Sequence, residues 1–197
     1  KRINEFLKER AKLLCFSKDS EVIDPYAFEE VIKGCFRPRM WAQYGDSHKG
    51  VCLVFDQEKL KEKIDDTFNS DVRVFLGDVQ YSSNYHGDLS IKYDLIKENL
   101  EVGLNHHLSL KLKDLFFTKF IDWQDETEFR WLAFTNSKSD YEYVNYEDAL
   151  NHIILGADFN EAYLPLIISF CEKFNVRSSK VRWHNGRPFE EPIYTTE

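Results

Sequence analysis

The sequence lacks several features that mark common protein classes. Its four cysteines, Cys15, Cys35, Cys52 and Cys171, are widely spaced and form no C-x-x-C pair, so we expect neither a structural zinc site nor a disulfide framework. No apolar run approaches the roughly 20 residues that a transmembrane helix needs. The sequence therefore predicts a cytoplasmic protein with no membrane partner, in a reducing compartment.

Positive charge is also scarce. Lysine and arginine total 26 against 34 acidic residues, which gives a net charge of −8. This balance argues against non-specific binding to nucleic acid. The glycine-rich phosphate-binding motifs and the G-x-S-x-G motif of hydrolases do not occur. His106 and His107 are neighbours on a predicted helix and point in different directions, so they form a poor ligand pair and no metal is predicted.

Aromatic residues, in contrast, are abundant. They make up 15% of the 197 residues, and 43% of the chain is hydrophobic, which is enough for one folded domain with a substantial core. Helix and strand patterns intermix without a βαβ rhythm. We therefore predict a single α+β domain over 1–197, with a mixed, mostly antiparallel sheet and flanking helices. A helical pattern starts at the first residue, so we expect that a native N-terminal segment is missing.

Hydrophobic periodicity and capping residues locate the predicted elements. Asp88 and Asn160 are the expected N-caps of two helices, and Gly77 is a candidate bulge. The residues after the Asn185-Gly186 turn are expected to be irregular. Helices are predicted over 2–12, 25–34, 37–44, 57–67, 89–117 and 161–174. Strands are predicted over 13–17 and 51–55, both buried, and over 72–81, 127–134, 141–146, 153–155 and 176–183.

The most informative stretch is WQDETEFRW, residues 123–131. On a strand its alternation places Glu126, Glu128 and Arg130 on one face and Trp131 on the other. Two carboxylates beside aromatic residues fit a catalytic or binding site. The alternative is a solvated strand face that carries an Arg–Glu ion pair.

A second cluster is MWAQYGDSHKG, residues 40–50. Trp41 and Tyr44 are three residues apart and share one helix face, either in the core or at a site. In the turn that follows, His48 is either a proton carrier or a solvated loop residue. Gly50 permits a special backbone angle or the close approach of a ligand.

These motifs together resemble a widespread bacterial family of small proteins of unknown function. They are LCFS at 14–17, MWAQY at 40–44, HKG at 48–50, Lys119, WQDETEFR at 123–130 and ILG at 154–156. The resemblance spans roughly residues 13 to 156, and the combination is more specific than any part. The segment between Ser17 and Met40 is longer than expected for that family, and the usual N-terminal strands are absent.

The Glu-x-Glu pattern is also similar to that of ADP-ribosyltransferases, whose substrate is NAD. This resemblance implies that Glu128 is the catalytic carboxylate, which stabilises an oxocarbenium-like transition state. It implies that Glu126 orients the acceptor. Arg130 on the same face instead favours neutralisation of Glu128. The residues expected to bind the nucleotide, partly by aromatic stacking, are Ser17, Trp41, Tyr44, His48, Lys119, Trp123 and Arg130.

Three functions stay open at this point. The first is an NAD-dependent ADP-ribosyltransferase-like enzyme, either a bacterial toxin or an anti-phage effector. The second is a non-enzymatic module of a defence or stress system, which binds a nucleotide or a protein. The third is a metal-dependent nuclease, against which the net charge argues. Its expected residues are Asp122, Asp125, Glu126 and Glu128, with Lys119.

Overall fold

The computed structural model divides into two compact units. It describes residues 7–19, 33–68, 72–84, 90–91, 94, 97, 99–137 and 139–196. Unit 1 comprises Lys1–Phe16 and Ser70–Glu142, and unit 2 comprises Ser17–Asn69 and Tyr143–Glu197. The single domain over 1–197 stays a prediction. Helices and mostly antiparallel strands occur together, which confirms the α+β class.

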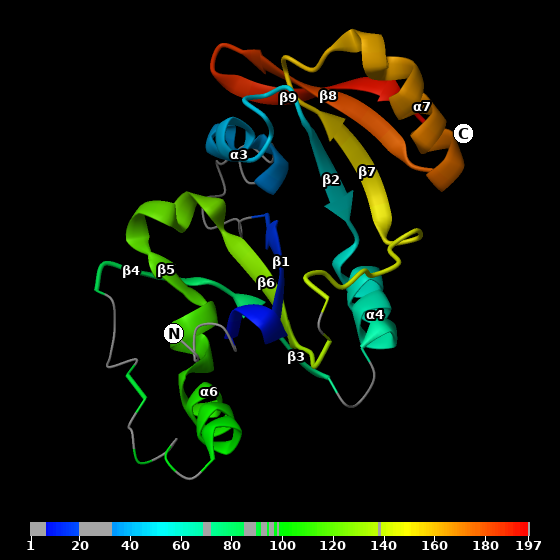
Figure 1. Cartoon of the computed structure of the whole chain (residues 1–197). Coiled ribbons are helices and arrows are strands. Elements are labelled where there is room, and N and C mark those ends of the chain that lie inside the picture. The colour runs from blue at the N-terminus through cyan, green and yellow to red at the C-terminus, as the bar shows by residue number, and fades with distance from the viewer. Residues whose placement is uncertain are drawn as a thin grey trace. The chain divides into compact units, whose positions relative to one another are not determined.

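Unit 1 is built on a three-stranded sheet in the order β1-β6-β3 (Figure 1). Its strands are β1 (Ala11–Ser17), β6 (Glu128–Phe134) and β3 (Arg73–Asp78). The central strand β6 is antiparallel to β3, with Arg73 opposite Phe134. Strand β6 is the central strand and buries Trp131, Leu132 and Ala133. The short strands β4 (Gln80–Ser82) and β5 (Thr118–Phe120) form a separate parallel pair.

Helix α6 (Leu100–Phe116) is the long helix of unit 1. The Asn99 side chain caps it by accepting hydrogen bonds from the backbone N–H groups of Glu101 and Val102 at 3.0 and 3.1 Å. The second half of the predicted helix over 89–117 is thereby confirmed. The expected cap at Asp88 lies outside the described residues. Gly103 is buried and does not interrupt the helix.

Unit 2 is built on a four-stranded sheet in the order β2-β7-β8-β9. Its strands are β2 (Val51–Phe55), β7 (Leu150–Leu155), β8 (Arg177–His184) and β9 (Arg187–Tyr194). Helix α7 (Leu164–Phe174) follows the short turn η3 (Glu161–Tyr163), which the Asn160 side chain caps as predicted. Helix α4 (Gln57–Thr67) matches its prediction.

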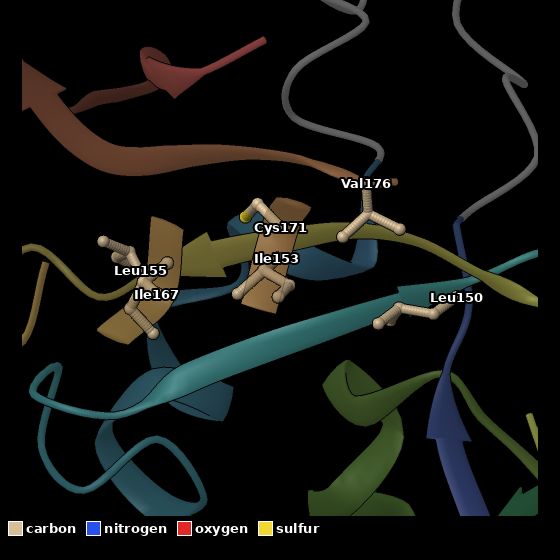
Figure 2. Close-up of a cluster of buried hydrophobic side chains, with 6 residues drawn as sticks. All are labelled: Leu150, Ile153, Leu155, Ile167, Cys171 and Val176. Carbon is tan, nitrogen blue, oxygen red and sulfur yellow. The ribbon is translucent and has the colours of Figure 1, made fainter. Parts of the chain in front are cut away.

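Both faces of this sheet carry an apolar cluster. On one face Ile153 and Leu155 of β7 belong to the same core cluster as Ile167 and Cys171 of α7 (Figure 2). Ile154 points to the opposite face because side chains alternate along a strand. There it belongs to a cluster with Trp41 of α3 (Pro38–Gln43), Val181 and Phe36, which ends η1 (Gly34–Phe36).

The prediction that residues 13–17 and 51–55 form buried strands is correct for the strands and wrong for their burial. Both β1 and β2 lie at the edge of their sheets. Leu13 is 47% exposed and Leu53 is 41% exposed. A continuous apolar run is typical of a strand covered on both faces, but edge strands also carry such runs.

Other boundaries differ from the sequence prediction. Ala11 and Lys12 start strand β1 and do not extend the predicted helix over 2–12. Residues 141–146 have no regular structure, so the strand predicted there is wrong. The expected strand over 72–81 is divided at Val79, and its pairing with β6 continues through Gly77 without a bulge. The helix predicted over 25–34 lies almost entirely outside the described residues.

The C-terminal segment also differs, since it is strand β9 and not an irregular tail. Asn185 and Gly186 have φ values of 50° and 77°. Two successive positive φ values are typical of the tight turn that joins antiparallel strands, so β8 and β9 form a hairpin. Within the described part of the chain, no helix is both long and apolar enough to span a bilayer.

Candidate functional site

The acidic stretch of unit 1 forms a buried cluster around one lysine. Lys119 of β5 lies before a 3-10 helix, η2 (Ile121–Glu126), and Thr127 then turns the chain with a left-handed φ of 40°. This turn brings both acidic side chains back to Lys119. The Lys119 Nζ atom lies 2.5 Å from Glu126 Oε2 and 2.8 Å from Glu128 Oε2.

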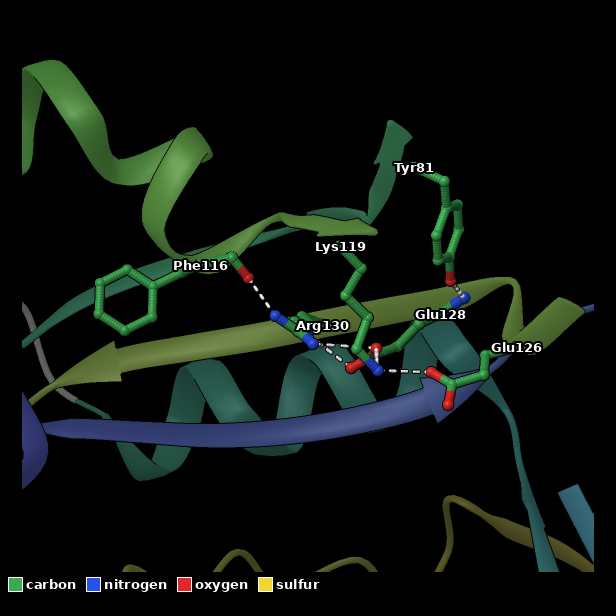
Figure 3. Close-up of polar contacts among 6 residues, drawn as sticks. All are labelled: Tyr81, Phe116, Lys119, Glu126, Glu128 and Arg130. Atoms are coloured by element: carbon green, nitrogen blue, oxygen red, sulfur yellow. Dashed lines mark hydrogen bonds and ion pairs between the residues drawn. The ribbon is translucent and has the colours of Figure 1, made fainter. Parts of the chain in front are cut away.

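Arg130 completes the cluster (Figure 3). Its Nε donates to Glu128 Oε1 at 2.5 Å and its Nη2 donates to Glu128 Oε2 at 3.0 Å, a two-pronged pairing. Its Nη1 donates to the carbonyl oxygen of Phe116, the last residue of α6. The terminal carbonyls of a helix lack partners within the helix, so Arg130 joins β6 to the end of α6.

The carboxylates of this cluster are among the most buried charged groups of unit 1. Glu126 is 3% exposed and Glu128 is 6% exposed. Burial by itself raises the pKa of the Glu128 carboxyl, but hydrogen bonds from Arg130, Cys15 and Lys119 outweigh it and lower that pKa to about 2. Burial, together with the hydrogen bond to Glu128, raises the pKa of Cys15 to about 12, so this thiol stays protonated.

The expected shared strand face is therefore only partly correct. Glu128 and Arg130 lie on β6 and contact each other, whereas Glu126 ends η2 and reaches Lys119 from there. The Trp123 ring lies beneath Lys119, with Nζ 5.5 Å from the ring centre. Two carboxylates and two cations neutralise one another, which satisfies the strict pairing that buried charges require.

The other four predicted site residues belong to unit 2. Trp41 is 3% exposed and its Nε1 donates to the carbonyl oxygen of Cys35 at 2.7 Å, so its ring is a core element. Tyr44 is exposed. His48 follows in the turn, and Ser17 ends β1. The predicted cleft that joins these residues to Glu126 and Glu128 spans both units and stays a prediction.

The turn over 45–50 has an unusual backbone. Asp46, Ser47 and His48 have positive φ values of 48°, 51° and 68°, a conformation that non-glycine residues seldom adopt. The His48 carbonyl oxygen accepts from the backbone N–H of Asp158 at 2.9 Å. A Cβ atom on Gly156 would lie 2.1 Å from that oxygen. The HKG and ILG motifs therefore meet, and glycine is required at 156 for this contact.

A polar trio of two buried side chains, His152 and Ser179, and the half-buried Glu190 lies on strands of the unit 2 sheet. The Ser179 Oγ atom lies 2.9 Å from His152 Nε2 and donates to Glu190 Oε2 at 2.9 Å. His152 Nδ1 is 3.7 Å from the same carboxylate. His152 and Ser179 are each 3% exposed. Burial lowers the pKa of His152 although Glu190 opposes this shift, which favours a neutral, hydrogen-bonded core histidine.

A separate cavity of about 440 Å³ lies within unit 1, between α6 and the strand ends of the sheet. Glu101, Asn105, Leu108 and Leu112 follow one another at helical spacing, so one face of α6 forms a wall. The rest of the lining comes from Ser109 of α6 and from residues in or next to the strands of the sheet. The cavity is lined by Arg10, Arg73, Phe75, Glu101, Asn105, Leu108, Ser109, Leu112, Phe134, Thr135 and Asn136.

Two polar groups of this cavity have no partner in the described part of the protein. The Thr135 hydroxyl is buried and makes no hydrogen bond to any described residue, although such groups are nearly always paired. Arg73 is exposed, and no ion pair or side-chain hydrogen bond of its guanidinium is found among the described residues. Arg10, in contrast, pairs with Glu101 at 2.9 Å.

This cavity was not predicted from the sequence. A signal was present, because the polar residues Thr135 and Asn136 directly follow a buried strand, where binding residues often lie. Arg73 stands opposite Phe134 at the start of β3. The sequence could not show that α6 forms a wall of the cavity. Only tertiary packing brings the helix over residues 100–116 to the end of this strand.

The described residues contain no group of three or more His, Cys, Asp or Glu side chains arranged to hold a metal ion. The four acidic residues expected for a nuclease accordingly do not converge as a set. Glu126 and Glu128 instead bind the Lys119 ammonium.

Comparison with known proteins gives one match. Residues 40–131 match the model of a family described as "Protein of unknown function (DUF2971)". This match confirms the predicted resemblance to a family of unknown function, over a shorter stretch than expected. It includes the whole charged cluster and the 45–50 turn, whereas Ser17 and Gly156 lie outside it. No curated protein and no solved structure matches the chain.

Proposed function

We propose that the protein is a non-enzymatic binding module and that its ligand site is the cavity of unit 1. The observation that carries this proposal is the cavity itself: about 440 Å³, lined by four apolar and seven polar or charged side chains. Small-molecule sites in proteins have this size and combine apolar surface with polar groups that fix the orientation of the ligand. A nucleotide-like molecule is the ligand class that we favour.

The charged cluster supports a structural role for the Glu-x-Glu motif in this proposal. In ADP-ribosyl transfer a carboxylate must face the positive charge that develops on the ribose. Here both oxygens of Glu128 already accept hydrogen bonds from Arg130, and Lys119 adds a second cation. A carboxylate whose charge is already balanced by two cations stabilises a developing positive charge less than a carboxylate without a paired cation.

Calorimetry with NAD, ADP-ribose and mononucleotides, combined with a chromatographic assay of NAD consumption, tests the proposal. We expect binding of at least one of these compounds without turnover of NAD. Turnover of NAD would overturn the proposal. If no compound binds, a ligand of the nucleotide class is excluded and a protein partner becomes the favoured alternative.

ADP-ribosyl transfer is the second candidate function, with the toxin or anti-phage role as its context. One observation favours it: two buried carboxylates share one lysine beside the Trp123 ring. In this case Glu128→Gln, which keeps the shape of the side chain, would abolish NAD consumption. The matched control is Glu172→Gln, which changes an exposed acidic residue of unit 2 and would leave NAD consumption unchanged.

A further inference from the structure

We propose that the cavity of unit 1 binds a mononucleotide, with the phosphate at Arg73 and the base among the aromatic and amide side chains. This inference rests on the proposed function and specifies the ligand class of the same site.

The charge of the lining favours an anion. Among the described residues, three ionisable side chains line the cavity, and two of them, Arg10 and Glu101, pair with each other at 2.9 Å. Arg73 therefore supplies a net positive charge at the cavity. A guanidinium binds phosphate with two parallel hydrogen bonds, which makes arginine well suited to this ligand.

The buried hydroxyl of Thr135 is the independent observation that indicates a ligand. Thr135 is 5% exposed and lines the cavity, and its Oγ1 finds no hydrogen-bond partner among the residues that the structure describes. Leaving such a group unpaired is unfavourable. Thr135 and Arg73 line the same cavity, so we place the phosphate or ribose between these two side chains.

The remaining lining suits a base. Phe75 and Phe134 form an aromatic pair with ring centres 6.3 Å apart, and aromatic rings stack readily on bases. Asn105 and Asn136 offer amide donors and acceptors for the polar edge of a base. The volume of about 440 Å³ lies in the range of pockets that enclose ligands of this size.

Titration calorimetry of the full chain with AMP, GMP, CMP and UMP tests the inference, with adenosine and inorganic phosphate as partial ligands. We expect at least one mononucleotide to bind more tightly than adenosine or phosphate alone. Arg73→Ala should weaken that binding by about tenfold or more, as expected for loss of a charged hydrogen bond. Thr135→Val, which keeps the shape and removes the hydroxyl, should weaken it severalfold.

The matched control is Arg177→Ala, which removes an exposed arginine of unit 2 and should leave binding unchanged. Since Arg73 is exposed, the Arg73→Ala variant should keep the fold. The backbone-amide NMR spectrum of each variant verifies that it is folded. Mononucleotide binding that survives unchanged in Arg73→Ala and Thr135→Val would overturn this inference and the assignment of the ligand site to the cavity. The proposal of a non-enzymatic binding module would then stand with its site elsewhere. If no mononucleotide binds, the inference is wrong, and the titrations with NAD and ADP-ribose decide the proposed function separately.

Discussion

The two units hold their motif residues by different physical means. In unit 1 the WQDETEFR motif is held by charge: Lys119 and Arg130 neutralise two buried carboxylates. In unit 2 the HKG and ILG motifs are held by close contact of backbone atoms, with Gly156 against the His48 carbonyl. One arrangement depends on ionisation and the other depends on the absence of a Cβ atom. Residues that resemble a catalytic signature can therefore be required for folding.

The largest effect is expected when the charge balance of unit 1 is broken. Arg130→Ala leaves Glu128 buried with one cation and removes the donor to Phe116 at the end of α6. We expect the free energy of unfolding to fall by about 3 kcal/mol, as for other broken buried pairs. Urea denaturation measures this change.

Fluorotryptophan NMR assigns the effect to a unit, since Trp123 and Trp131 report on unit 1 and Trp41 and Trp183 report on unit 2. The matched control is Arg182→Ala, which breaks an exposed pair with Glu191 and should cost about 0.5 kcal/mol or less. A loss for Arg130→Ala as small as that of the control would contradict a structural role for the cluster.

The corresponding change in unit 2 is Gly156→Ala. The added Cβ would lie 2.1 Å from the His48 oxygen, so the turn over 45–50 must move. We expect a loss of about 2 kcal/mol, typical of overpacking, with the main shift in the Trp41 resonance. Gly186→Ala is the contrasting variant, because no atom lies within 4 Å of its added Cβ and only the positive φ of 77° opposes it. Equal losses in the two glycine variants would show that close contact is not the cause.

A pH series sharpens the comparison for unit 1. The pKa of Glu128 is lowered to about 2 in the folded protein from an ordinary value of 4.5. The carboxylate therefore contributes stability that is fully present above about pH 4.5 and is lost as the pH falls towards 2. The stability difference between the wild type and Glu128→Gln should shrink over this interval, as measured by urea denaturation. A difference that stays constant from pH 5 to pH 2 would argue against the ion pairs as its source.

The smallest effect is expected at His152 in unit 2. Burial lowers its pKa from 6.5, against the opposing effect of Glu190, while Arg177 and Lys33 add to the shift. A lowered histidine pKa contributes stability above about pH 6.5, which is lost as the pH falls through the unfolded and then the folded value. His152→Gln should remove this dependence between pH 7 and pH 5 and leave that of Glu128 unchanged. Persistence of the full dependence in this variant would assign it to another group.

Much of the fold was predictable from local patterns. Helix α4, helix α3 after Pro38 and the cap at Asn160 follow from spacing and capping residues. The pairing of Glu128 with Arg130 follows from the two-residue period of a strand, and neutralisation was one of the open alternatives. The exposure of the edge strands β1 and β2 and the hairpin formed by β8 and β9 were not predicted, because both depend on which strands become neighbours.

The sequence by itself determined the α+β class, the positions of most helices and strands, and the charges that must find partners. Only the tertiary structure decided that Lys119 meets Glu126 and Glu128 in a buried cluster and that Thr135 and Arg73 line a cavity beneath α6. The physical reason is the distance along the chain over which each kind of interaction acts. Periodicity and capping act over a few residues, whereas burial and charge pairing depend on groups that folding brings together from distant parts of the chain.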